Sequence, residues 1–259
     1  MQATPSETSN TFQPGRLWRW VGSGFWAIAD QGLFAGSNFL LNVLLTQWLT
    51  PNAYGAFAVG FAVLLFVGAI HVALIGEPIL VFGPGRYKSD PRAYLGATLY
   101  AHILLSGIAM LLMVAVGVVW KGELGTALIG FGLGCPCILL LWMMRRACYM
   151  LLAPRAAAIA GLGYLFLMLG GLFALHHLRR ISLLPAIAVL DGSNLLAGLG
   201  LLVIVRPRLV HVGGSFFRNV LIEHFRFGRW GVGTGVLYFF SGQLFYITLA
   251  VFDGLNASA

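Results

Sequence analysis

The sequence predicts an all-α polytopic membrane protein with about seven transmembrane helices, in which a first six-helix lobe is followed by the first helix of a second lobe. Two observations predict this class. Apolar residues make up 59% of the 259 residues and charged residues only 9%, a balance that a soluble domain could not hide in its core. Seven stretches long enough to cross a bilayer alternate with connections that are in turn basic and nearly uncharged.

The predicted spans are separated by segments that hydrocarbon would not accommodate. Thr50-Pro51-Asn52 ends the first span, because proline has no backbone donor. The polar, turn-rich segment 83–91 ends the second span, and Trp120-Lys121-Gly122-Glu123 makes a short outer turn with an interfacial tryptophan. The spans are expected at residues 21–49, 54–82, 94–119, 124–144, 156–177, 182–205 and 231–252.

The chain divides into four parts. Residues 1–15 are rich in Ser, Thr, Gln and Pro and are expected to form a disordered tail, and residues 16–205 form the six-helix lobe. Residues 206–230 are interpreted as a cytoplasmic linker with an amphipathic helix that starts at Ser215, because apolar residues recur there at helical spacing between arginines. An ordinary basic loop is the alternative. Residues 231–259 are expected to be the first helix of an incomplete second lobe.

The basic residues predict the orientation. With the N-terminus in the cytoplasm, thirteen of the sixteen Lys and Arg residues fall on inner segments, and only Lys121, Arg179 and Arg180 fall on outer ones. Positively charged short loops resist translocation, so a multi-pass protein with a cytoplasmic N-terminus is expected. The net charge of +8 then reflects topology, and membrane lipids rather than nucleic acid are the expected partners, since no block of five basic residues occurs.

Polar side chains inside the predicted spans are the candidate functional residues, because they are costly in hydrocarbon. In the first span Gln31, Asn38 and Asn42 fall on one helical face with Asp30 at its edge, which predicts either a hydrated cavity or hydrogen bonds between helices. The second span carries His71, for which a satisfied core histidine is the competing interpretation.

Two further carboxylates stand out. Glu77 precedes Pro78, where a kinked helix could expose it to a cavity, although a pair with Arg86 or Lys88 at the headgroup level is equally consistent. Asp191 lies near the middle of the sixth span, one helical turn from Asn194. No catalytic motif, metal-ligand set or cofactor motif is found, so an enzyme is not expected, and the three cysteines are expected to be small fillers in a helix.

Four segments carry a resemblance to a known family. Residues 24–31 (GFWAIADQ), 38–42 (NFLLN) and 48–55 (WLTPNAYG), together with 77–87 (EPILVFGPGRY), resemble the first two helices of bacterial polysaccharide exporters. These are the lipid-linked oligosaccharide flippases of the multidrug/oligosaccharidyl-lipid/polysaccharide exporter superfamily. As motif the resemblance covers residues 22–87, and as a pattern of spans it covers essentially the whole chain.

The resemblance implies two six-helix lobes that form a V in the bacterial inner membrane and work by alternating access. It implies an undecaprenyl-pyrophosphate-linked oligosaccharide as substrate, H+ or Na+ as coupling ion, no other cofactor, and polysaccharide biosynthesis proteins as partners. Because the sequence supplies one lobe and one further helix, a C-terminally truncated fragment is expected. The alternatives are a membrane assembly subunit that transports nothing and a multidrug exporter of the same superfamily.

On this hypothesis the candidate residues take three roles. The residues expected to line the cavity are Asp30, Gln31, Asn38, Asn42, His71, Asp191 and Asn194. The protonatable or ion-coupling candidates are Asp30, Glu77 and Asp191. The candidates for the rim that meets the lipid phosphate are Arg86, Lys88 and Arg145.

Overall fold

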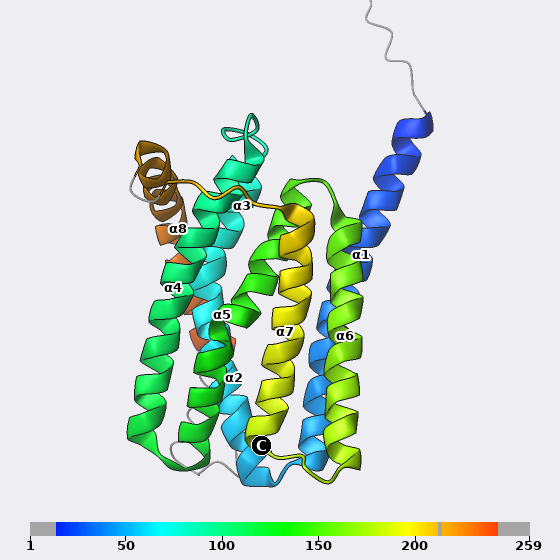
Figure 1. Ribbon diagram of the computed structural model, residues 1–259, viewed down its shortest axis with the longest axis vertical. Helices are drawn as coiled ribbons and strands as arrows, with labels where there is room; N and C mark the ends of the chain where they lie inside the picture. Colours follow the sequence, from blue (N-terminus) through cyan, green and yellow to red (C-terminus); the bar gives the residue numbers. More distant parts are fainter. Residues whose placement is uncertain (1–13, 212–213, 243–259) are drawn as a thin grey trace, which may run out of the picture.

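A computed structural model describes residues 14–211 and 214–242, and over these residues it contains helices and no strand (Figure 1). The second helical rod consists of α2, a π-helical turn η1 and α3 without interruption. The elements are α1 (Pro14–Trp48), α2 (Pro51–His71), η1 (Val72–Gly76), α3 (Glu77–Phe82), α4 (Pro91–Trp120), α5 (Gly122–Met150), α6 (Pro154–His177), α7 (Leu183–Val205) and α8 (Ser215–Gly242).

The all-α polytopic membrane class predicted from the sequence is confirmed. Five of the described helical rods are long and apolar enough to cross a membrane: Pro51–Phe82, Pro91–Trp120, Gly122–Met150, Pro154–His177 and Leu183–Val205. The rod α1 is 35 residues long but carries the polar stripe that includes Asp30 and Asn38, which lowers its hydropathy. Most of the predicted tail, residues 1–13, and the end of the seventh predicted span, residues 243–252, lie outside the described part of the chain.

The helix α8 differs from the arrangement expected for residues 206–252. The sequence predicts a surface helix from Ser215 that ends before a separate span at residue 231, whereas α8 is one continuous helix from Ser215 to Gly242. No proline interrupts this stretch, and Gly228 serves close packing instead of a break. A Cβ atom at Gly228 would lie 2.5 Å from the Ala73 carbonyl oxygen, so α8 approaches the second rod closely at this point.

Connections with different charge lie at opposite ends of the bundle (Figure 1). The start of α1, the α3–α4 turn, the α5–α6 turn and the α7–α8 connection share the end that we call the basic end. The turns that join α1 to α2, α4 to α5 and α6 to α7 lie at the other end. The charge asymmetry of the sequence is therefore a real asymmetry along the bundle axis, and the assignment of the basic end to the cytoplasm stays a prediction.

Local sequence signals account for where the helices begin. The Thr50 hydroxyl accepts a hydrogen bond from the Ala53 amide at 3.3 Å, and Pro51 occupies the first helical position, where its missing N–H costs nothing. Asp90 caps α4 in the same way by accepting from the Ala93 amide at 3.1 Å. These caps confirm Thr50-Pro51 and Asp90-Pro91 as helix boundaries.

The helix α5 occupies the centre of the bundle and contacts α2, α4, α6 and α7. In its most apolar window 72% of the residues are buried, more than in the other candidate spans of the described chain. Small residues permit these close contacts. Ideal Cβ atoms at Gly117 and Gly125 would each lie within 2.8 Å of the other glycine's carbonyl oxygen, so the backbones of α4 and α5 touch near their turn.

The segment before Pro78 adopts a π-helical turn. Pro78 has no N–H to donate to the carbonyl of Leu74, four residues earlier, and the helix accommodates this by a wider turn over Val72–Gly76. The sequence predicts an irregular helix at Glu77-Pro78, and the observed irregularity is this π-helical turn.

We expect the substitution Gly125→Ala to destabilise the bundle by about 1–3 kcal/mol, because the added methyl group would press against the Gly117 backbone. Gly163→Ala is the matched control, since nothing lies within 4 Å of a Cβ atom at Gly163. Thermal unfolding in detergent measures both. Equal melting temperatures for the two variants would contradict the close α4–α5 contact.

Candidate functional site

A buried ion pair joins α1 to α5. Asp30 is 0% exposed and Arg145 is 8% exposed. The Arg145 side chain donates twice to the carboxylate, from Nε to Oδ1 at 3.1 Å and from Nη2 to Oδ2 at 2.8 Å. The two charges therefore neutralise each other in the two-bond geometry that suits guanidinium and carboxylate groups.

The surroundings complete this site. The Tyr149 hydroxyl, one helical turn after Arg145, donates to Asp30 Oδ2 at 2.6 Å. The Arg145 guanidinium lies 4.2 Å from the centre of the Phe34 ring, one turn after Asp30 on α1. On α6, Gly161 lies beside the carboxylate, since a Cβ atom there would make an ordinary van der Waals contact with Asp30 Oδ1 at 3.5 Å. Each charged group is thus held by several neighbours.

The pair relates two candidates that the sequence assigned to different roles. The predicted fourth span ended at residue 144, which placed Arg145 on the inner rim, but α5 continues to Met150 and includes Arg145. Arg145 therefore lies within a helix and against Asp30. Binding of a lipid phosphate by Arg145 and exposure of Asp30 to a cavity both stay predictions, and both require this ion pair to open.

The remaining polar residues of α1 lie at different depths. Gln31 is exposed, and Asn38 and Asn42 are half-buried. The Asn42 amide donates to the Asn38 carbonyl at 2.8 Å, and its Oδ1 accepts from the Tyr54 hydroxyl of α2 at 3.3 Å. Asn42 thus acts in this structure as a polar contact between the first two helical rods, while a role in binding sugar stays a prediction.

His71 is buried and paired with a second histidine. Its Nε2 lies 3.0 Å from Nδ1 of His102 on α4, and the rings meet edge to face. Within the described part of the chain His71 Nδ1 has no hydrogen-bond partner. The histidine sits one residue before the π-helical turn, so the pair fixes α2 to α4 at the start of that turn.

The candidates at the basic end form ion pairs of their own. Glu77 is 3.3 Å from Arg146 of α5, and Arg86 is 2.8 Å from Glu223 of α8. The Tyr87 hydroxyl donates to Glu223 at 2.8 Å, and burial followed by this carboxylate raises the pKa of Tyr87 to about 12. The alternative that Glu77 pairs with Arg86 or Lys88 is therefore wrong in its partners, since Glu77 pairs with Arg146 and Arg86 with Glu223. Lys88 is exposed.

Asp191 lies on α7, where its side chain packs against α5. Its carboxylate packs over Gly134, where a Cβ atom would lie 2.0 Å from Oδ1, so only glycine fits beneath it. Among the described residues nothing donates a hydrogen bond to Asp191 Oδ1. Asn194, one turn later, is buried and donates to the Leu190 carbonyl at 2.8 Å. The candidates of α7 therefore do not meet those of α1 in one cluster.

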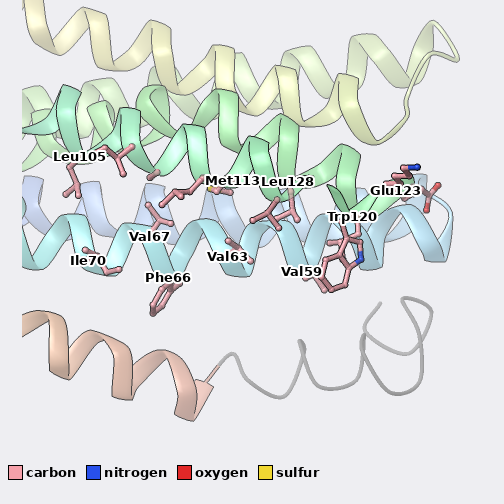
Figure 2. Close-up of a pocket in the computed structure, with 17 residues that line it drawn as sticks. Val59, Val63, Phe66, Val67, Ile70, Leu105, Met113, Trp120, Glu123 and Leu128 are labelled. Carbon is pink, nitrogen blue, oxygen red and sulfur yellow. The ribbon is translucent and has the colours of Figure 1, made fainter. Parts of the chain in front are cut away.

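One well-formed cavity is apolar. It has a volume of ≈ 780 Å³ and lies between α2, α4 and α5, lined by side chains such as Val63, Val67 and Met113, with Trp120 and Glu123 at the α4–α5 turn (Figure 2). None of the candidate residues lines it. Asp191 instead borders a cavity of ≈ 280 Å³ between α5 and α7. No group of three or more His, Cys, Asp or Glu side chains in the described chain could hold a metal ion.

Sequence reasoning missed several residues that complete these contacts. They are Phe34, Tyr94, His102, Tyr149, Glu223 and His224. One signal was available, since Arg145 and Tyr149 are four residues apart and so share a helical face in the way that Asp30 and Phe34 do.

The fold is shared with transporters of the MOP superfamily. A MOP superfamily transporter from Pyrococcus furiosus, with a binding pocket of reverse polarity, superposes with a TM-score of 0.65 at 13% identity over 84% of this chain. A multidrug resistance MATE family transporter of the same superfamily, in an outward-facing conformation, gives a TM-score of 0.64 at 13% identity. The chain spans about half the length of each, 52%. No family model and no curated protein matches the sequence.

We expect the single substitutions Asp30→Leu and Arg145→Met each to cost about 3–5 kcal/mol, because each leaves one buried charge without its partner. The double variant should regain most of that loss, since it leaves no buried charge. Arg146→Met is the control, because its half-exposed pair with Glu77 is worth about 1 kcal/mol or less. Denaturant unfolding of the parent protein and of these four variants measures the losses. Losses that simply add in the double variant would contradict the pair.

Proposed function

We propose that this chain forms the first half of a transporter that flips a lipid-linked oligosaccharide across the bacterial inner membrane by alternating access. The observation that carries the proposal is the likeness of the fold to MOP superfamily transporters over 84% of the chain. The oligosaccharide substrate is supported by the resemblance of residues 22–87 to polysaccharide exporters. The basic end of the bundle then faces the cytoplasm, as its excess of Lys and Arg favours.

The ion pair gives the proposal a mechanism. Helix α1 is held to α5 by Asp30 and Arg145, and a coupling proton that neutralises Asp30 would end the attraction. Arg145 would then be free to meet the pyrophosphate of the carrier lipid, together with Arg86 and Lys88 at the same end. The ion pair is thus a closed state that substrate and coupling ion both act to open.

The other polar residues fit the same cycle. Gln31 is exposed, and Asn38 and Asn42 are half-buried on α1, where amides suit the hydroxyl groups of a sugar. Asp191 is a second protonatable group, because its unpartnered Oδ1 in the described structure gives a proton or sodium ion a place to bind. Polysaccharide biosynthesis proteins would supply the substrate on the cytoplasmic side.

A multidrug exporter is the second candidate function. The likeness to the multidrug resistance MATE family transporter, with a TM-score of 0.64, favours it. Carboxylates within the helices, such as Asp30 and Asp191, would suit a cationic drug.

Reconstituted vesicles separate these functions. We expect the transporter that contains this chain as its first half to flip a fluorescent undecaprenyl-pyrophosphate disaccharide under a pH gradient, and Asp191→Asn, which keeps the shape of the side chain, to remove the stimulation by the gradient. Glu123→Gln is the control, because Glu123 is exposed at the opposite end of α5. Flipping is measured by quenching of the outer-leaflet probe with dithionite.

Three other outcomes would contradict the flippase proposal or its coupling residue. Stimulation that survives in Asp191→Asn would show that this carboxylate does not couple transport. Efflux of ethidium without flipping of the lipid would favour the multidrug exporter. Vesicles that move neither probe would favour a membrane assembly subunit that transports nothing.

A further inference from the structure

The helix α8 is bound to the irregular part of the second rod. Its contact with η1 is more extensive than its contact with α4, and it also contacts α2 and α3. A Cβ atom at Gly228 would lie 2.5 Å from the Ala73 carbonyl oxygen and 2.8 Å from the Leu74 Cα atom. Only glycine at position 228 allows α8 to rest directly on the backbone of the π-helical turn.

A histidine of α8 supplies the hydrogen bond that Pro78 cannot. In a regular α-helix the Leu74 carbonyl would accept from the amide of residue 78, but Pro78 carries no N–H. His224 Nδ1 lies 3.0 Å from this carbonyl oxygen. Because a carbonyl only accepts, Nδ1 is the protonated nitrogen of the His224 ring. A backbone acceptor that would otherwise lack a donor is thus satisfied by another helix.

The second ring nitrogen of His224 is hydrogen-bonded as well. His224 Nε2 is 2.7 Å from the Tyr94 hydroxyl, which is also 3.1 Å from the Pro78 carbonyl. With Nδ1 protonated, Nε2 is an acceptor, so Nε2 and the Pro78 carbonyl share the single hydrogen of the Tyr94 hydroxyl. His224 and Tyr94 are both buried, so these bonds form away from solvent. Next to His224, Glu223 binds Arg86 and Tyr87, which ties the same turn of α8 to the α3–α4 connection.

We propose that His224 and Gly228 hold α8 on the π-helical turn η1 of the second rod, a contact that we call the latch. We propose further that the latch releases when the second rod changes conformation during the transport cycle. The release step rests on the proposed transport function, and the docking step does not. The latch would link the helix that leads out of the six-helix lobe to the conformation of the second rod, because His224 donates to the Leu74 carbonyl while α8 is docked.

Disulfide formation between α8 and η1 measures the docking without any substrate. A Cβ atom at Gly231 would lie 3.2 Å from the Ala73 Cβ, close to the ~3.8 Å typical of a disulfide. Cysteines at both positions, Ala73→Cys and Gly231→Cys, in a chain whose three native cysteines are replaced by alanine, should therefore cross-link rapidly in the membrane.

Matched variants then test the two latch residues. We expect Gly228→Ala and His224→Phe to slow cross-linking about tenfold, the effect expected when one buried hydrogen bond or close contact is lost. Gly233→Ala is the control for the glycine, because nothing lies within 4 Å of a Cβ atom there. His224→Asn is the control for the histidine, since its amide nitrogen can replace Nδ1 as donor. Parental rates in Gly228→Ala and His224→Phe would overturn the docking step.

Release is tested by locking the latch. In vesicles that carry the fluorescent lipid, assayed with iodide as a non-reducing quencher in place of dithionite, the oxidised double-cysteine protein should stop flipping, and a reductant should restore it. Unchanged flipping by the oxidised protein would overturn release and leave the proposed function standing. If the reduced protein and the parent both fail to flip the lipid, the proposed function fails and the release step with it, while the cross-linking series still upholds or overturns the docking.

Discussion

The arrangement of α1 depends on the ion pair between Asp30 and Arg145. A charge in the apolar interior of a helical bundle is costly unless a partner of opposite charge also satisfies its hydrogen bonds, and this pair meets that condition with Tyr149 as a third contributor. Such a contact is strong when intact and expensive when half of it is removed. In this structure α1 packs along α6, and the ion pair is its polar link to α5 at the centre of the bundle.

The second rod follows the same rule with a backbone group. Pro78 has no N–H to donate to the Leu74 carbonyl. The structure has a π-helical turn at this point, and His224 of α8 donates to that carbonyl. Helix α5 contacts both of these regions. Its Arg145 pairs with Asp30 of α1, and the neighbouring Arg146 pairs with Glu77, next to Pro78. Polar contacts thus connect α1, α5, the second rod and α8 near the basic end of the bundle.

The number and order of the helices could be predicted because apolar length and turn residues are properties of consecutive residues. The partners of the polar residues could not. Asp30 and Arg145 are 115 positions apart, and a span boundary placed at residue 144 left the arginine in a loop. The continuity of α8 was also hidden, since its arginines suggest a surface segment, whereas the feature that docks it is a glycine meeting backbone from the second rod.

The central claim is that the Asp30–Arg145 pair holds α1 against the bundle, and spin-label distances test it most directly. Labels at the exposed positions Ile28 on α1 and Val203 on α7 report the place of α1 at the basic end. The account gives one narrow distance distribution for the parent protein and a broader or longer one when Arg145 is replaced by methionine. Identical distributions for the two proteins would contradict it.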